Sequence, residues 1–246
     1  MKAEKEINYF GRDLEAMSFA VNYHSWILEE FKPFLGHNVA EVGAGTGNFT
    51  SLLIKEKIEH LSAFEPSANM YSILAERFKE KKGIEVSDRF FNEVGREYKN
   101  CFDSIIYVNV LEHIKEDARE LSTVWDSLKE GGYFLGFVPA LSWLNSDLDR
   151  KLGHVRRYEK QALIKLVEQV GFEIIKVRYF DLAGILPWLV FFVWLKRPIT
   201  GGQVSFYDKT VVPVMKRIEG LIAPPLGKNL LVVAKKQADQ PLGINK

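Results

Sequence analysis

Three glycines and one acidic residue carry the clearest chemical signal in this sequence. Gly43, Gly45 and Gly47 lie in the segment EVGAGTGNFT, directly after a predicted strand, and Glu65 ends the next predicted strand. Glycines let the backbone turn sharply and allow a ligand to approach the main chain without side-chain interference. A carboxylate at the end of the neighbouring strand can accept hydrogen bonds from both hydroxyls of a ribose. The pattern therefore predicts a site for a nucleoside.

Other interpretations of these residues stay open. A dinucleotide-binding turn would place its third glycine at position 48, where this chain has Asn48, so the spacing disfavours a dinucleotide without excluding one. The glycines can also form a tight turn needed only for packing, and Glu65 can be an exposed acid that ends its strand. Asp88, which follows a third predicted strand, is placed to accept a hydrogen bond from an adenine amino group, but it too can be a solvent-exposed acid.

These residues need a sheet to bring them together, and the sequence predicts one. The fourth strand is apolar throughout, which is typical of a strand buried on both faces. Strands and helices that alternate along the chain, as they do here, form a parallel sheet with right-handed crossovers, which is a doubly wound α/β fold. The predicted strands cover residues 38–42, 61–64, 84–86, 102–109, 133–138, 173–179 and 229–234, and the predicted helices cover 49–57, 68–81, 116–128 and 160–170, with one or two more in 4–34.

The same pattern predicts how the chain is divided. Residues 1–37 form a helical N-terminal cover, 38–235 the α/β domain and 236–246 a flexible tail. About fifty residues separate the last two strands, far more than a usual connection, so residues 182–226 are expected to form an insertion.

Composition and charge narrow the class of protein. The 246 residues include 33 Lys and Arg, 32 Asp and Glu and one cysteine, Cys101. A net charge of +1 argues against bulk nucleic-acid binding. An intrachain disulfide needs two cysteines, and the charged opening segment offers no apolar run for secretion. We therefore expect a cytoplasmic protein.

The order of the motifs resembles the class I S-adenosylmethionine-dependent methyltransferases. The likeness rests on EVGAGTG at 41–47, on Glu65 and on FDSIIYVNVLEHI at 102–114, and it covers about residues 38–140. The segments LEAMSFAVNYHSWIL, GHVRRY and GFEIIKVRYF also resemble uncharacterised bacterial methyltransferases thought to accompany cell-surface glycan genes. The resemblance implies a Rossmann-like, seven-stranded, mostly parallel sheet with an antiparallel last strand. It also implies S-adenosylmethionine as cofactor and S-adenosylhomocysteine as product.

The resemblance assigns cofactor-binding roles to particular residues. The glycines would lie along the methionine and ribose part of the cofactor, Glu65 would bind the ribose hydroxyls, and Asp88 would face the adenine. Asn109 and Val110 would line the pocket where the fourth strand ends. The full set comprises Glu41, Gly43, Ala44, Gly45, Gly47, Glu65, Pro66, Asp88, Asn109 and Val110. We assign no residue to a metal.

Two histidines are the catalytic candidates. A sulfonium methyl group is already activated, so alignment of the acceptor can supply about 7 to 11 kcal/mol of the barrier. A hydroxyl acceptor also needs a base, and histidine suits this role near neutral pH. His113 follows the fourth strand and is predicted to be the base or to orient the acceptor, with packing in a loop as the alternative. His154, which follows the fifth strand, is the second candidate.

Four further residues are candidates for binding the acceptor. Arg156 and Arg157 lie with His154 in the most basic stretch of the chain and would suit an anionic acceptor, since arginine forks match planar oxyanions. A solvated basic surface is the alternative. Tyr23 and His24 lie on a predicted N-terminal helix that folds over the cofactor as a lid in similar enzymes, although core packing would also explain them.

An apolar segment, LAGILPWLVFFVWL at 182–195, belongs to the predicted insertion. It is shorter than the roughly twenty residues that a bilayer crossing needs, and Pro187 interrupts it. Three interpretations remain: a buried helix, an apolar acceptor pocket or homodimer face, or a segment that rests on the inner face of a membrane.

The sequence therefore predicts an enzyme that transfers a methyl group from S-adenosylmethionine to a small-molecule, glycan or lipid-linked acceptor by in-line displacement. Two alternatives from other classes stay open. One is a nicotinamide-dependent oxidoreductase, and the other is a non-catalytic nucleoside-binding module of the same fold.

Overall fold

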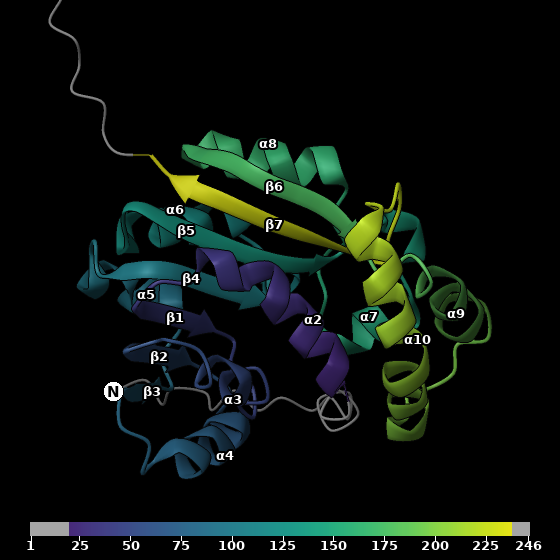
Figure 1. The fold of residues 1–246 in the computed structure, drawn as a ribbon, viewed down its shortest axis with the longest axis horizontal. Helices are drawn as coiled ribbons and strands as arrows, with labels where there is room; N and C mark the ends of the chain where they lie inside the picture. Colours follow the sequence, from purple (N-terminus) through teal and green to yellow (C-terminus); the bar gives the residue numbers. More distant parts are fainter. Residues whose placement is uncertain (1–19, 238–246) are drawn as a thin grey trace, which may run out of the picture.

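A seven-stranded sheet forms the centre of the computed structural model, which describes residues 20–237 (Figure 1). The strand order is β3-β2-β1-β4-β5-β7-β6, with β1 to β5 paired in parallel and β7 antiparallel to both β5 and β6. This confirms the Rossmann-like fold and the antiparallel last strand. The strands are β1 Asn38–Val42, β2 His60–Phe64, β3 Ile84–Ser87, β4 Phe102–Val108, β5 Leu128–Pro139, β6 Phe172–Phe180 and β7 Asn229–Lys236.

Helices cover both faces of the sheet. One apolar core packs under α2 (Val21–Phe31), α3 (Thr50–Leu53) and α10 (Gly201–Leu221), and the other packs under α5 (Phe91–Val94), α6 (Asp117–Ser127) and α8 (Lys160–Val170). Figure 1 shows α2 and α10 in front of the sheet and α6 and α8 behind it. The helix α4 (Ala68–Phe78) packs beside β3.

Strand alternation explains the two cores. On β4, Ile105 and Tyr107 belong to one core and Ile106 to the other, and all three are fully buried. Successive side chains of a strand point to opposite faces, so a strand covered on both faces has to be apolar at every position. The continuous apolar run in this segment is therefore accounted for by its central place in the sheet.

Element boundaries differ most from the expectations at two places, and elsewhere by at most three residues. The helix predicted over 49–57 is only the short α3, because the amides of Lys55 and Glu56 bond to carbonyls three residues earlier and the helical ladder tightens. The strand predicted over 133–138 is longer and begins at Leu128. Residues 4–19 of the predicted N-terminal helices and residues 238–246 of the predicted tail lie outside the described part of the chain.

The segment between β6 and β7 contains the expected insertion. It holds α9 (Ile185–Trp188), a π-helical stretch η5 (Leu189–Trp194) and α10. No side chain of α9 or η5 is fully buried, but Ile185, Trp188 and Leu189 are partly buried against the core, so the segment packs on the domain as a half-buried helix and not as a buried one. Within residues 20–237, no helix combines the length and apolar character that a bilayer crossing requires. Instead, the end of α10 leaves large apolar side chains exposed, including Ile218, Leu221 and Ile222.

Candidate functional site

The glycine turn at the end of β1 has the conformation that its residues predict. Gly43, Gly45 and Gly47 have φ angles of 72°, 56° and 82°, which residues other than glycine rarely adopt. The amide of Gly43 donates to the carbonyl oxygen of Phe64, at 2.8 Å, and the amide of Ala44 donates to the same oxygen at 3.1 Å. The turn is therefore held against the end of β2, immediately before Glu65.

Glu65 is joined directly to this turn. Its Oε2 accepts a hydrogen bond of 2.8 Å from the amide of Gly45, and its Oε1 accepts one of 2.9 Å from the amide of Ser67. The side chain is buried, with 6% exposure. Each carboxylate oxygen has two lone pairs, so each can accept one further hydrogen bond from a ligand.

A cleft of about 550 Å³ opens over the turn and Glu65. That volume lies in the range of small-molecule and cofactor sites. Most of the residues selected from the sequence line it. They are Tyr23, His24, Glu41, Gly43, Ala44, Gly45, Glu65, Pro66, Asn109, Val110, His113, His154 and Arg157.

Three of the selected residues lie elsewhere, each for a local reason. Gly47 turns its α-carbon toward Phe78, whose ring would lie 2.4 Å from an added Cβ. Asp88 is exposed to solvent beside Arg89, which does line the cleft. Arg156 is bound to the carboxylate of Asp117 and to the carbonyl oxygen of Lys115, at 2.7 Å from the latter.

Glu41 lies at the floor of the cleft and is almost fully buried. Burial raises the pKa of its carboxyl to about 8, although a hydrogen bond of 2.6 Å from the hydroxyl of Thr50 partly opposes that shift. The charge of the nearby Glu65 contributes to this raised pKa. Glu41 is therefore neutral at pH 7, and Glu65 supplies the negative charge beside the turn.

The two candidate histidines come together at the other end of the cleft, although 40 positions separate them in the sequence. Their ring centres lie 4.8 Å apart with the rings nearly perpendicular. His113 belongs to the single turn η3 (Leu111–His113) after β4, and His154 follows α7 (Asp147–Leu152). Both come from segments that follow the carboxyl ends of neighbouring parallel strands, β4 and β5.

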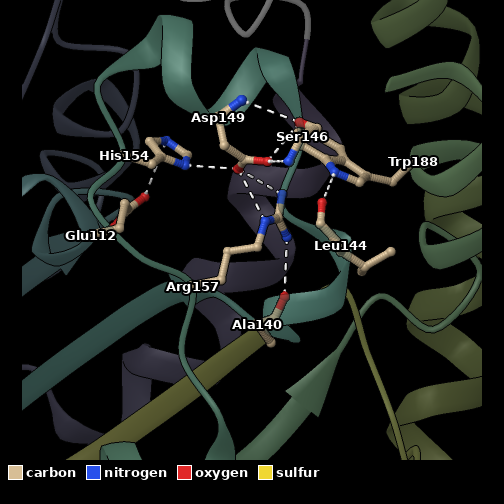
Figure 2. Close-up of polar contacts among 8 residues, drawn as sticks. All are labelled: Glu112, Ala140, Leu144, Ser146, Asp149, His154, Arg157 and Trp188. Carbon is tan, nitrogen blue, oxygen red and sulfur yellow. Dashed lines mark hydrogen bonds and ion pairs between the residues drawn. The ribbon is translucent and has the colours of Figure 1, made fainter. Parts of the chain in front are cut away.

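A network of charged side chains fixes His154 (Figure 2). Its Nδ1 lies 2.9 Å from Oδ1 of Asp149, and the same oxygen accepts hydrogen bonds from Arg157 at 2.8 and 3.1 Å. The other oxygen of Asp149 accepts from Ser146, which closes a capping box at the start of α7. Burial raises the pKa of Asp149, but these partners lower it more, to about 2. Asp149 is therefore ionised at physiological pH.

Burial also controls the protonation of His113. Burial and, to a smaller extent, the nearby His154 lower the pKa of the ring to about 4. Beside these rings, burial raises the pKa of Glu112 to about 7. At pH 7 His113 is therefore a neutral imidazole, which can accept a proton.

The far wall of the cleft contains residues that the sequence reading missed. Trp188 of α9 stacks under the Arg157 guanidinium, at 4.7 Å from its ring centre, and donates a hydrogen bond of 3.0 Å to the carbonyl oxygen of Leu144. Lys228, just before β7, points over the Trp188 ring and pairs with Asp181 at 3.0 Å. Trp188, in the long insertion, and Lys228, just after it, belong to no motif, so only the folded chain reveals their position.

The sequence reading also missed Glu112 and Asp149. Glu112 stood beside His113 within the motif VLEHI, and Asp149 stood five positions before His154. Their proximity to the two candidate histidines was the available signal. A lone acid in a loop or helix is most often solvated, so neither residue by itself indicates a site.

A family comparison agrees with this site. A family model described as a methyltransferase domain matches residues 15–177, more than half of the chain, so the chain belongs to this methyltransferase family. It is a class I S-adenosylmethionine-dependent methyltransferase. An uncharacterised methyltransferase from Staphylococcus carnosus is 28% identical over 165 residues, which are 66% of this chain and 74% of that protein.

Solved structures share the fold. An S-adenosylmethionine-dependent methyltransferase from Archaeoglobus fulgidus aligns with a TM-score of 0.62 at 17% identity, over 91% of this chain and 99% of that one. Phosphoethanolamine N-methyltransferase 2 from Haemonchus contortus, solved with S-adenosylmethionine, aligns with a TM-score of 0.60 at 15% identity, over 93% of this chain and 59% of that one.

The residues around the cleft fit S-adenosylmethionine, the cofactor of this family. The positive-φ glycines Gly43 and Gly45 line the cleft with main chain, and the buried Glu65 keeps a free lone pair on each oxygen. An ionised carboxylate also complements a cofactor that carries a sulfonium charge.

Proposed function

We propose that this enzyme methylates a hydroxyl-bearing acceptor, either a small molecule or the sugar of a glycan or lipid-linked glycan. The observation that carries the proposal is that one cleft contains both the Glu65 turn and the His113–His154 pair. When bound, S-adenosylmethionine supplies an activated methyl group. The turn and Glu65 would hold the nucleoside, and the histidine end of the cleft would place the acceptor oxygen in line with the departing sulfur.

The histidines suit an acceptor that loses a proton on attack. With its pKa lowered to about 4, His113 is neutral at pH 7 and keeps an unprotonated ring nitrogen that can accept a hydrogen bond from the acceptor hydroxyl, although the same shift makes it a weak base. His154 is held by Asp149 through Nδ1, so its Nε2 side faces away from that carboxylate. One ring would take the proton or orient the hydroxyl, and the other would complete the binding surface.

The charges around this end of the cleft favour a neutral acceptor. Arg157 is bound to Asp149, Arg156 is bound to Asp117, and Lys228 is paired with Asp181. An anionic acceptor would have to compete with these carboxylates for each cation. A hydroxyl group would leave every pair intact, so the pairing supports a sugar or alcohol over a phosphate or carboxylate.

The insertion supports an acceptor that extends beyond the cleft. Trp188 and Ile199 line the cleft, and large apolar side chains such as Phe206 and Leu221 are exposed along α10. An apolar tail of a lipid-linked sugar could follow this surface. The same surface would also suit a homodimer, which stays a prediction.

A methyl-transfer assay tests the proposal. Purified protein would be incubated with S-adenosylmethionine labelled in its methyl group and with sugar, lipid-linked sugar, sugar phosphate and amine acceptors. We expect label on a hydroxyl acceptor, at least tenfold slower transfer by His113→Ala and His154→Ala, and an unchanged rate for the surface variant His37→Ala.

Four results would contradict the proposal. Transfer only to amine or phosphate acceptors would overturn the acceptor class. Unchanged rates in both histidine variants would dismiss them as catalytic residues. Binding of S-adenosylhomocysteine with no transfer to any acceptor would favour the non-catalytic module, and stabilisation by NAD in place of S-adenosylhomocysteine would favour an oxidoreductase.

A further inference from the structure

The side chains of Glu112, His113 and His154 form a cluster, and the proposed transfer uses its two histidines but gives no role to Glu112. One carboxylate oxygen and one nitrogen from each ring all lie within 4.8 Å of one another. Two of the three residues are consecutive in η3, and the third reaches them from the segment after α7. The fold therefore brings three potential metal ligands together at the acceptor end of the cleft.

Glu112 is the least explained member of this cluster. Its side chain is fully buried, and neither carboxylate oxygen has a hydrogen-bond partner in the described part of the chain. The Nε2 of His154 lies 3.9 Å from Oε1, which is too far for a hydrogen bond. A buried polar group without a partner is costly, so its retention needs a reason. A ligand between Glu112 and the rings would provide one.

The surroundings of His154 match those of a metal-bound histidine. Asp149 binds Nδ1 at 2.9 Å, which leaves Nε2 facing Glu112 (Figure 2). Metal-binding histidines usually donate their other ring nitrogen to a carboxylate or a backbone carbonyl in this way. The ring of His113 is likewise hydrogen-bonded to the backbone of Gly153. Both rings are thus oriented before any ligand arrives.

We propose that Glu112, His113 and His154 bind one divalent transition-metal ion of the series from Mn²⁺ to Zn²⁺. Two imidazoles and one carboxylate are ligands that these ions favour, whereas Mg²⁺ prefers oxygen alone. Bonds of about 2.0 to 2.2 Å place neighbouring ligand atoms roughly 3 to 4 Å apart, so the 3.9 Å between Nε2 and Oε1 needs little adjustment.

The position of the site gives the metal access to the cleft. His113 and His154 both line it, so coordination positions not taken by protein would open toward the acceptor. In the metal-bound state the rings act as ligands, and the metal takes over the orientation of the acceptor oxygen that the rings alone would otherwise provide. Metal binding itself stands independently of the proposed acceptor.

Titration of tag-free, chelator-treated protein with MnCl₂, and in a separate calorimetric run with ZnCl₂, tests the site. Calorimetry and the electron paramagnetic resonance signal of free Mn²⁺ should show one bound ion per chain. Glu112→Gln, His113→Ala and His154→Ala should each bind at least tenfold more weakly. The control His37→Ala removes an exposed ring that lies 3.1 Å from Glu59, and it should bind as wild type does.

Two further measurements keep the test decisive. Spin-echo modulation of Mn²⁺ bound to wild type should show coupling to imidazole nitrogen, which does not depend on any variant folding. Calorimetry with S-adenosylhomocysteine should give the same affinity, within about threefold, for Glu112→Gln and wild type. Three results would overturn the metal site: no bound Mn²⁺ or Zn²⁺, Mn²⁺ binding without nitrogen coupling, or equal metal binding by Glu112→Gln and wild type. If nucleoside binding is retained in that case, the proposed function still stands.

Discussion

The amide nitrogen of Gly45 lies 2.8 Å from Oε2 of Glu65, so the glycine turn after β1 and the acid after β2 form one unit. This bond uses one lone pair of the carboxylate and aims the rest of it into the cleft. A hydrogen bond from a backbone amide to a buried carboxylate is stronger than one between neutral groups. The turn therefore positions the acid, and the acid in turn fixes the turn.

Gly43→Ala should destabilise the chain. The φ angle of 72° is strained for alanine, and the new Cβ would lie 2.3 Å from a methyl carbon of Val110. We expect the free energy of unfolding to fall by about 2 to 4 kcal/mol, measured by urea denaturation. The matched control is Gly202→Ala in α10, where a Cβ meets no atom within 4 Å.

The control should leave stability unchanged or raise it by up to about 1 kcal/mol. The double variant Gly43→Ala with Val110→Ala should recover the part of the loss due to the clash but not the part due to φ. Equal stabilities of Gly43→Ala and Gly202→Ala would show that the turn is not constrained as described.

Glu41→Gln should flatten the pH dependence of stability. Because burial raises the pKa of Glu41 from 4.5 to about 8, the folded chain holds a proton there that the unfolded chain has released. The stability of wild type should therefore fall as pH rises from about 5 to about 8, and the glutamine variant should lack this contribution. Thermal melts of both proteins at pH 5, 6, 7 and 8 measure it. Parallel curves would contradict the buried, neutral state of Glu41.

Asp149→Ala should cost about 3 to 5 kcal/mol of unfolding free energy. It removes the carboxylate that binds Arg157, whose guanidinium is buried and would be left without its counter-charge. The control Glu116→Ala breaks an exposed pair with Arg119 and should cost less than about 1 kcal/mol. Similar losses in the two variants, in denaturant titrations, would mean that the Asp149 network does not stabilise the fold.

The sheet and the turn were predictable because their signals are local. Apolar runs mark β4, and the glycines between β1 and α3 need positive φ angles that almost no other residue adopts. Glu65 could be found because it ends a strand next to that turn. In these segments the residue type alone indicates whether a position is buried or needs an unusual backbone conformation.

The acceptor end could not be predicted in the same way, since it depends on contacts between distant segments. Arg156 and Arg157 are adjacent and chemically identical, yet one binds Asp117 outside the cleft and the other binds Asp149 at its wall. Extended backbone sends successive side chains in opposite directions, and only tertiary structure decides which one faces the site. The meeting of His113 with His154 has the same origin.

Calorimetry with S-adenosylhomocysteine tests the central claim, that the turn and Glu65 together hold a nucleoside. We predict a dissociation constant on the order of 1 μM for wild type. Glu65→Ala should bind at least tenfold more weakly, because it loses charge-assisted hydrogen bonds of about 1.5 to 3 kcal/mol. The exposed-acid control Glu80→Ala should match wild type. Equal affinities for Glu65→Ala and Glu80→Ala, or no binding to the wild-type chain, would contradict the account.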